Sequence, residues 1–379
     1  MSLMITIKRT FFWRYLRNLK YKFKKIIKVA KNRKLLKFDG KNLTQDMQKE
    51  MQAIMKNNKN IYLHDEATAK SIAKNWDVII ATPSNIRFIS NAIPIVLSAN
   101  NNYAPYVAVM LQSILDTSNP KRIYHFLIFE YDFSDTTKKE LLYQVSKFPH
   151  CSIDFVNTKI SLDTIPIFSK AHLSLDTFSR LFIPYWLDGY QKVIYCDSDM
   201  LARQDLADLY DIDISDYSVG ATANKIITRI LSNKNYSSFS PRIYASFSLL
   251  EDWSRYIQAG VLLFNTKKFK EKKSLQDTIR FSIYYTNRFK QRYNDQDILS
   301  LLLDGDCLIL PNEWNYCWSS SKRSLIPIHE IEPTVKIIHY TTKTKPWMDF
   351  FNIENNADAL EYRNYAKNVP LYNSRNQQH

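Results

Sequence analysis

Residues Lys192–Asp205 read KVIYCDSDMLARQD, and this stretch decides the fold. Its opening run, Val193–Cys196, is apolar and partly β-branched, which predicts a buried strand. Asp197 and Asp199 follow at once and point to the same side of an extended chain, so their carboxylates converge. A hard divalent cation with oxygen ligands, Mn²⁺ or Mg²⁺, relieves their repulsion. The alternative is an ordinary acidic turn after a strand, since Asp is common in turns.

The composition is that of a folded chain. With 379 residues and 45% hydrophobic content, disorder is not expected. No apolar run reaches the roughly 18 residues of a membrane-spanning helix, and the start lacks the apolar segment of a signal peptide. The cysteines form no C-x-x-C pair or zinc spacing, which favours reduced, cytosolic thiols. They are Cys151, Cys196, Cys307 and Cys317.

Glycine is rare, and this excludes two kinds of phosphate site. The five glycines are Gly40, Gly189, Gly220, Gly260 and Gly305. Neither a G-x-G-x-x-G turn nor a Walker loop can be built from glycines so far apart. A bound phosphate must therefore be neutralised by a metal ion and cationic side chains.

Positive charge is concentrated at the start of the chain. Residues 1–40 hold 13 Lys and Arg against one acidic residue, Asp39, and so carry +12 of the net charge of +15. Within residues 8–38 an apolar stripe predicts a basic amphipathic helix, which favours contact with an anionic membrane surface. Docking on the protein itself or on a partner helix is the alternative, and both are favoured over nucleic acid. The stripe consists of Phe12, Leu16, Leu19, Phe23, Ile26 and Ala30.

Beyond residue 92, predicted strands and helices alternate, which favours an α/β fold with a mostly parallel sheet. Ligands bind such sheets beyond the carboxyl ends of the strands, where Asn100, Asp197 and Asp199 are expected to share one crevice. A helical stretch with an interruption at Pro184 is predicted over Thr177–Leu187. Residues 352–379 are polar and are expected to form a loosely held tail. The predicted strands are Ile93–Ser98, Ile123–Glu130, Ser152–Val156, Val193–Cys196, Tyr217–Thr222 and Lys336–Tyr340.

Five segments in order give the chain a family resemblance. They read PIVLSANNNYAPYVAVMLQSIL, FSRLFIP, VIYCDSDM, QAGVLLFNTKKF with NDQDILS, and HYTTKTKPW, all within residues 93–348. Together they resemble glycosyltransferase family 8, the retaining, metal-dependent sugar transferases that include bacterial lipopolysaccharide galactosyl- and glucosyltransferases and glycogenin. The resemblance implies a GT-A fold, a Rossmann-like mixed sheet flanked by helices, which binds a nucleotide sugar, usually UDP-linked, with Mn²⁺. We expect a basic, mostly helical extension at 1–91, the GT-A domain at 92–351 and the polar tail at 352–379.

The resemblance also implies roles for individual residues. Asp197, Asp199 and His339 match the metal ligands, and Asp295 and Gln296 are the catalytic candidates, with Gln296 beneath the anomeric carbon. Within the donor site, Arg180 and Lys345 match the residues that hold the diphosphate. The donor-binding set is Asn100, Asn102, Tyr103, Arg180, Asp197, Ser198, Asn224, Gln258, Thr342 and Lys345.

Four positions depart from the family pattern. Asn100 and Asn224 stand where Asp is common, Gln258 where Asn is common, and Thr342 where Gly is frequent. An amide at position 100 can accept from the uracil N3–H only through its carbonyl oxygen. The sugar pocket is therefore expected to differ from the galactosyl type.

The resemblance therefore implies a retaining, Mn²⁺-dependent transferase that moves a hexose from a UDP-sugar to a glycan, lipid-linked or protein acceptor, with Mg²⁺ as the alternative ion. Acceptor contacts are expected in Lys225–Tyr256 and Trp314–Glu332, because such folds carry them in variable loops. The Lys-, Asn- and Ile-rich composition suggests a bacterial protein. The resemblance implies cell-surface glycan synthesis, and the basic segment 8–38 predicts a cytoplasmic enzyme peripheral to the inner face of the membrane. An oligomer is compatible with these expectations. The alternatives are an inactive nucleotide-sugar or glycan-binding protein of the same fold, and a metal-dependent phosphatase or nucleotidyltransferase.

Overall fold

The structure is a computed structural model of the chain. It describes residues 86–163, 175–225, 252–289, 294–318 and 357–376, with the short pieces 83, 165, 227–228, 250, 333–341 and 345–348. These residues belong to one unit of the chain, whereas a second unit, Met1–Ala53 with Tyr236–Leu249, lies outside the described residues. The basic segment 8–38 lies outside them too, so its helix and its membrane contact stay predictions.

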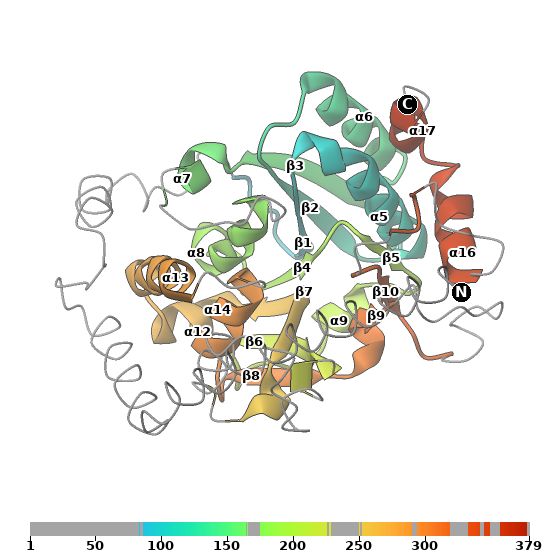
Figure 1. Cartoon of the computed structure of the whole chain (residues 1–379). Coiled ribbons are helices and arrows are strands. Elements are labelled where there is room, and N and C mark those ends of the chain that lie inside the picture. The colour runs from blue at the N-terminus through green and yellow to red at the C-terminus, as the bar shows by residue number, and fades with distance from the viewer. Residues whose placement is uncertain are drawn as a thin grey trace, which may run out of the picture. The chain divides into compact units, whose positions relative to one another are not determined.

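A seven-stranded sheet forms the centre of the described unit (Figure 1). Its order is β3-β2-β1-β4-β7-β6-β8. Strand β7 is antiparallel to both neighbours, and the other neighbouring pairs are parallel. This mixed sheet confirms the predicted fold class. The bounds are Ala92–Ala99 (β1), Ile123–Glu130 (β2), Cys151–Asn157 (β3), Lys192–Cys196 (β4), Val219–Ala223 (β6), Ile257–Asn265 (β7) and Cys307–Leu310 (β8).

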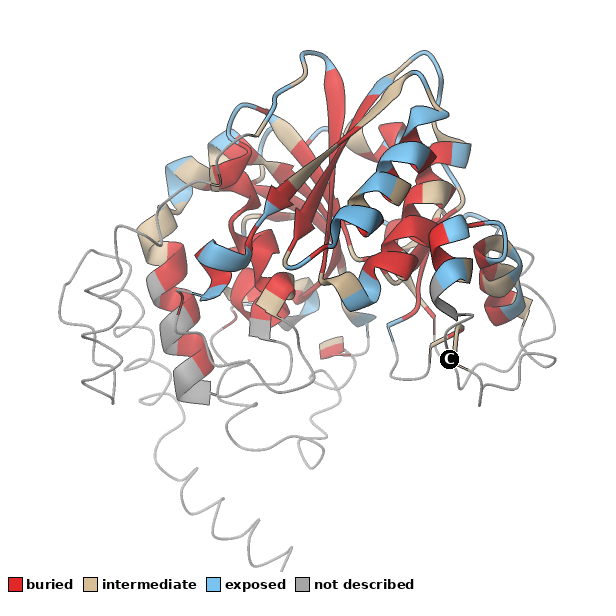
Figure 2. Ribbon diagram, turned by 90° about the horizontal axis from the view of Figure 1, so that it is seen from above, coloured by how far each residue is buried: buried red, intermediate tan, exposed pale blue. Residues whose placement is uncertain are grey.

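Helices cover both faces of this sheet. Figure 1 shows α5, α6, α16 and α17 on one side and α8, α12, α13 and α14 on the other. Most residues of the central strands are buried (Figure 2), and all eight residues of β1 are buried, as expected for an apolar run in a sheet covered twice. No described helix is long and apolar enough to cross a membrane. The bounds are Ala104–Thr117 (α5), Asp135–Ser146 (α6), Ile183–Trp186 (α8), Thr266–Lys272 (α12), Leu275–Phe289 (α13), Asn294–Leu302 (α14), Ala357–Ala366 (α16) and Pro370–Asn376 (α17).

Several short elements connect these layers. The helical stretch predicted over Thr177–Leu187, with its interruption at Pro184, is formed by two helices, η2 (Leu175–Leu181) and α8. Pro184 lies in the first turn of α8, a position where its missing N–H leaves no helical bond unmade. The remaining short helices are α7 (Lys159–Asp163), α9 (Ala207–Tyr210), η1 (Asn101–Tyr103), η2 (Leu175–Leu181), η4 (Trp253–Arg255) and η5 (Asn312–Asn315).

A second, three-stranded sheet brings the end of the chain back to the acidic motif. It has the order β5-β10-β9, formed by Met200–Ala202, Ile337–His339 and Tyr316–Cys317. Strand β10 is antiparallel to β5, and His339 pairs with Met200. Because Met200 directly follows Asp199, this register carries His339 to the acidic pair.

The switch in strand order falls between β1 and β4, where α/β sheets bind their ligands. Leu97 of β1 pairs with Cys196 of β4, so Asn100 and Asp197 leave the sheet at the same edge. Because β7 runs the other way, its first residues, Ile257 and Gln258, lie at this edge as well. Asn100 and Asp197 thus lie at one edge of the sheet, as expected.

The expectation of a loosely held tail at 352–379 is wrong for residues 357–376. These form α16 and α17, and Tyr362 is fully buried. Its ring lies 5.1 Å from that of Tyr340 and 5.3 Å from that of Trp347, measured between centroids. The polar composition of the segment concealed a small apolar face of Ala359, Tyr362, Ala366 and Val369, which packs against the core.

Candidate active site at the carboxyl edge of the sheet

Asp197, Asp199 and His339 converge at the end of β4. Their ligand atoms all lie within 4.8 Å of one another. His339 Nε2 is 3.1 Å from Asp199 Oδ1 and 3.7 Å from Asp197 Oδ2. The cluster is formed by the turn after β4 and by β10, which are 140 residues apart in the chain but adjacent through the small sheet.

Gly260 makes room for the imidazole of His339. A Cβ atom on Gly260 would lie 2.3 Å from His339 Cε1 and 2.6 Å from His339 Nδ1, closer than non-bonded atoms approach. The carbonyl of Gly260 also accepts the backbone N–H of Asp197 at 2.8 Å. Gly260 therefore allows β7 to lie close to both His339 and Asp197.

Lys345 lies against the same cluster. Its Nζ donates to Asp199 Oδ2 at 2.6 Å and to the carbonyl of Tyr340. Burial opposes ionisation of Asp199, but the charge of Lys345 and the contacts that Asp199 makes with Lys345 and His339 outweigh it and hold the pKa of Asp199 below its ordinary value. At Asp197, burial raises the pKa, and Arg180 and His339 offset this only in part.

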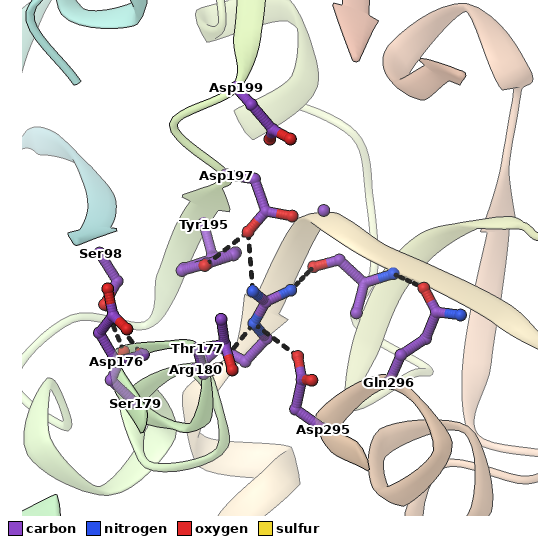
Figure 3. Close-up of polar contacts among 12 residues, drawn as sticks. Ser98, Asp176, Thr177, Ser179, Arg180, Tyr195, Asp197, Asp199, Asp295 and Gln296 are labelled. Carbon is purple, nitrogen blue, oxygen red and sulfur yellow. Dashed lines mark hydrogen bonds and ion pairs between the residues drawn. The ribbon is translucent and has the colours of Figure 1, made fainter. Parts of the chain in front are cut away.

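Arg180 is buried beneath Asp197 (Figure 3). Its Nη2 donates to Asp197 Oδ1 at 2.8 Å, and its Nε lies 3.1 Å from Asp295 Oδ2. Nη1 donates to the carbonyl of Ala259 at 2.8 Å, and the guanidinium lies 4.6 Å from the ring centroid of Tyr195. Arg180 thus joins one candidate metal ligand to one catalytic candidate.

Helix η2 is held in place by bonds to β1. Ser98 Oγ donates to the carbonyl of Asp176 at 3.0 Å, and Ser179 Oγ donates to Ser98 Oγ at 2.8 Å (Figure 3). All three residues are buried. These bonds fix the helix that carries Arg180 against the carboxyl end of β1.

Asp295 and Gln296 lie in the first turn of α14. Gln296 Oε1 accepts the backbone N–H of Ala259 at 3.2 Å, and its Nε2 donates to the hydroxyl of Tyr256 at 3.0 Å. The same hydroxyl donates to Asp297 Oδ1 at 2.6 Å. Gln296 is thereby placed over the start of β7, on the same side as Asp295 and Arg180 (Figure 3).

Asn100 caps helix η1 directly after β1. Its Oδ1 accepts the backbone N–H groups of Asn102 at 3.1 Å and of Tyr103 at 3.3 Å, so the carbonyl expected to meet a base already has two donors. Tyr103 is 41% exposed. Burial raises the pKa of Tyr103, whereas the nearby charge of Lys345 lowers it.

The other expected donor residues differ in their placement. Gln258 Oε1 accepts the N–H of Gly260 at 2.5 Å and Asn315 Nδ2 at 2.7 Å, so this side chain is directed toward His339. Asn224 follows β6 and caps the next turn through an N–H of Ile227 at 3.1 Å. Ser198 is buried between the two aspartates, and Thr342 lies outside the described residues.

Two site residues were missed in the sequence. Tyr195 donates its hydroxyl to Asp197 Oδ1 at 2.7 Å, and Asn315 Oδ1 lies 2.9 Å from His339 Nδ1. Tyr195 stands two residues before Asp197, so strand alternation places it on the same face. No local pattern marks Asn315. Its segment was expected to contact the acceptor, yet Trp314, Asn315 and Trp318 are buried.

The donor set suits a divalent cation. Two carboxylates and an imidazole offer oxygen and nitrogen ligands within 4.8 Å of one another. Mn²⁺ accepts this mixture, and Mg²⁺ prefers the oxygens. Because Gly260 has no side chain, the imidazole can lie beside the two carboxylates, so all three groups can bind one ion. The residues present therefore fit such an ion.

A GT-A-type α/β fold with this Asp-Asp-His cluster defines a class of glycosyltransferase. The chain matches the model of "Glycosyl transferase family 8" over residues 94–350, more than half of its length. It therefore belongs to glycosyltransferase family 8 and is a glycosyltransferase by family.

Curated relatives agree with this assignment. A putative glycosyltransferase of Haemophilus influenzae is 30% identical over 268 residues, covering 68% of this chain and 74% of that protein. The lipopolysaccharide 1,2-glucosyltransferase of Escherichia coli K12 is 23% identical over 287 residues, covering 72% and 77%. Glycosyltransferase GlyA of Streptococcus pneumoniae is 26% identical, but the chain spans only 32% of its length.

Two solved structures share the fold. The galactosyltransferase LgtC, solved in complex with donor and acceptor sugar analogues, superposes with a TM-score of 0.56 at 23% identity and covers 73% of this chain and 96% of its own. The bifunctional glycosyltransferase WbbM superposes with a TM-score of 0.62 at 22% identity, covering 79% of this chain and 53% of its own. At this identity the likeness concerns the fold.

Proposed function

We propose that the chain is a retaining glycosyltransferase that moves a hexose from a UDP-sugar to a glycan, lipid-linked or protein acceptor with the help of Mn²⁺. The observation that carries this proposal is the cluster of Asp197, Asp199 and His339, with Lys345 beside it, at the switch point of the sheet. Residues 92–351 are the proposed catalytic domain, and 1–91 its extension.

Asp197, Asp199 and His339 would hold the cation. When bound, a divalent ion supplies positive charge to a departing diphosphate. Because Lys345 and His339 keep the pKa of Asp199 low, this carboxylate is ionised and ready to bind a cation at neutral pH. The Nζ of Lys345 donates to Asp199 in the structure, and its proposed role is to donate to a phosphate oxygen when the diphosphate is bound.

Arg180 has a proposed role other than direct contact with the diphosphate. Its donors are engaged by Asp197, Asp295 and two backbone carbonyls. A buried guanidinium with these partners holds both carboxylates in place. We therefore assign Arg180 the positioning of Asp197 and Asp295.

Transfer with retention needs the acceptor oxygen to reach C1 from the face that the diphosphate leaves. The C1–O bond to the diphosphate breaks, a C1–O bond to the acceptor forms, and the acceptor proton passes to the departing phosphate oxygen. Gln296 is an amide and hence a poor nucleophile, so its role is to stabilise an oxocarbenium-like state and not to form a lasting covalent bond. Asp295 adds negative charge on the same side.

The test is release of UDP from a panel of UDP-hexoses by the purified full chain, with Mn²⁺ and with EDTA. We expect UDP release to depend on Mn²⁺. In Asp199→Asn the rate of release should fall at least about 100-fold, because the variant lacks a ligand of the cation that stabilises the negative charge on the departing diphosphate. Asp216→Asn, whose side chain is 92% exposed, is the matched control and should keep full activity. UDP-sugar binding with no release under any condition would instead support the inactive binding protein.

We also propose that residues 8–38 hold the enzyme at an anionic membrane surface, on the side that supplies nucleotide sugars. The support is the basic amphipathic pattern of this segment. A lipid-linked precursor of a cell-surface glycan is the acceptor class that fits this location.

A further inference from the structure

The second ring nitrogen of His339 meets a buried chain of amides. Nδ1 lies 2.9 Å from Asn315 Oδ1, and Asn315 Nδ2 lies 2.7 Å from Gln258 Oε1. Gln258 Oε1 also accepts the backbone N–H of Gly260 at 2.5 Å. The chain links β7, η5 and β10. Asn315 is 2% exposed, His339 3% and Gln258 8%, so water does not compete for these bonds.

The direction of every bond in this chain follows from one backbone group. The N–H of Gly260 can only donate, so the atom of Gln258 that faces it is the oxygen. The atom of Asn315 that faces this oxygen must then be its NH₂ group, which turns Asn315 Oδ1 toward His339. An oxygen at 2.9 Å requires a proton on His339 Nδ1. This assignment comes from the network of partners, as it does for amides and imidazoles in general.

One contact points the other way, and it is the weaker. Gln258 Nε2 lies 3.4 Å from His339 Nδ1, and a bond there would need Nδ1 without a proton. This distance exceeds the usual range for N–H donors, whereas the contact of 2.9 Å falls within it. The contact with Asn315 therefore decides the position of the proton.

We propose that Asn315 is a positioning residue that, with Gln258 and the N–H of Gly260, keeps a proton on His339 Nδ1 and leaves the Nε2 lone pair for the divalent cation. The inference rests on the proposed function, since it assigns work to the same metal site. Nε2 is the ring atom that lies 3.1 Å from Asp199 Oδ1. Metal-binding imidazoles are commonly oriented by such a partner on the other nitrogen.

Affinity for Mn²⁺, measured by calorimetry on the full chain with UDP present, is the first test. Asn315→Leu keeps the volume and removes the acceptor, and should weaken binding about 10- to 100-fold, the effect of losing an outer partner of a metal-bound imidazole. Asn315→Asp keeps an oxygen opposite Nδ1 and should return to within about tenfold of the wild type. Asn312→Leu changes the same residue type in the same helix, η5, and should bind as the wild type does.

Nitrogen-15 NMR of the metal-free protein is the second test, and it needs no metal or activity. The signals of His339 are identified by their loss in His339→Gln. We expect a protonated Nδ1 in the wild type and in Asn315→Asp, and an unprotonated Nδ1 in Asn315→Leu. Thermal unfolding of each variant shows that it is folded.

The results of the two tests distinguish a failure of this inference from a failure of the proposed function. An unprotonated Nδ1 in the wild type, or an Asn315→Leu protein that binds Mn²⁺ as tightly as the wild type, would overturn the inference. If instead the wild type binds no Mn²⁺, or Asp199→Asn binds it unchanged, the proposed metal role fails, and NMR still reports whether Asn315 sets the proton.

Discussion

At the scale of single residues, Gly260 is the position where sequence and site are most tightly linked. It is one of five glycines in the chain, and its missing Cβ leaves the space that the ring of His339 fills. Two contacts under 3 Å to that ring mean that any side chain must displace it. The residue therefore determines where one ligand of the site can lie.

We predict that Gly260→Ala lowers Mn²⁺ affinity and costs about 1–3 kcal/mol of unfolding free energy, as overpacking of a tight core does. Calorimetry and urea unfolding measure the two effects. Gly220→Ala is the control in β6, because its Cβ would meet only side-chain tips at 3.3 Å and should change stability by no more than about 1 kcal/mol. Unchanged Mn²⁺ binding by Gly260→Ala would show that the ring of His339 does not need this space.

The residues of the site differ in how far they could be predicted from the sequence. The pair Asp197 and Asp199 follows from a buried strand and a spacing of two, which are local signals. His339 was named only through the family resemblance, because a histidine in an apolar strand gives no local sign of a ligand. Asn315 and the orientation of Gln258 escaped both, since their roles arise only when β7, η5 and β10 meet.

At the scale of elements, α16 supports the turn that carries Lys345. Arg363 donates to the carbonyls of Pro346 and Met348, both at 2.6 Å, and Trp347 of the same turn stacks on Tyr106 with centroids 3.9 Å apart. Arg203, one residue after β5, forms an ion pair with Glu361 of α16. A segment expected to be a loose tail thus holds both sides of the site.

We predict that Tyr362→Ala destabilises the protein by about 3–5 kcal/mol, the cost of truncating a fully buried aromatic ring. Urea unfolding followed by fluorescence measures the change. Tyr143→Ala on α6 is the matched control, since this tyrosine is 65% exposed and its loss should cost no more than about 0.5 kcal/mol. Equal stability of the two variants would mean that α16 does not pack on the core in solution.

Elements were predicted best where their pattern was continuous. Strands β1, β2 and β4 are mostly apolar and were found within one residue of their ends. Helix α16 was missed because its apolar face is short and interrupted by charged residues. Helices η2 and α8 correspond to the stretch predicted as helical with an interruption at Pro184, because a proline fits the first turn of a helix and not its interior.

At the scale of the whole molecule, charge divides the chain into two parts of different chemistry. Residues 1–40 carry +12 of the net +15, so the remaining 339 residues are close to neutral. A nearly neutral segment is not strongly attracted to an anionic membrane surface. The proposed membrane contact therefore depends on the extension alone.

We predict that deletion of residues 4–38 abolishes co-sedimentation with vesicles of anionic lipid and leaves UDP release in solution unchanged. Raising the salt concentration should weaken binding of the full chain, because the attraction is electrostatic. Neutral vesicles are the control for lipid composition. Equal sedimentation of the full and shortened chains would refute the membrane role of this segment.

The proposed function requires Asp197, Asp199 and His339 to hold one divalent cation while a UDP-sugar is cleaved. A crystal structure of the full chain with Mn²⁺ and UDP is the decisive measurement. We expect the ion to be bound by Asp199, by His339 through Nε2 and by Asp197, and Lys345 to contact the phosphates. An ion bound to UDP at another place, with these three side chains left aside, would contradict it.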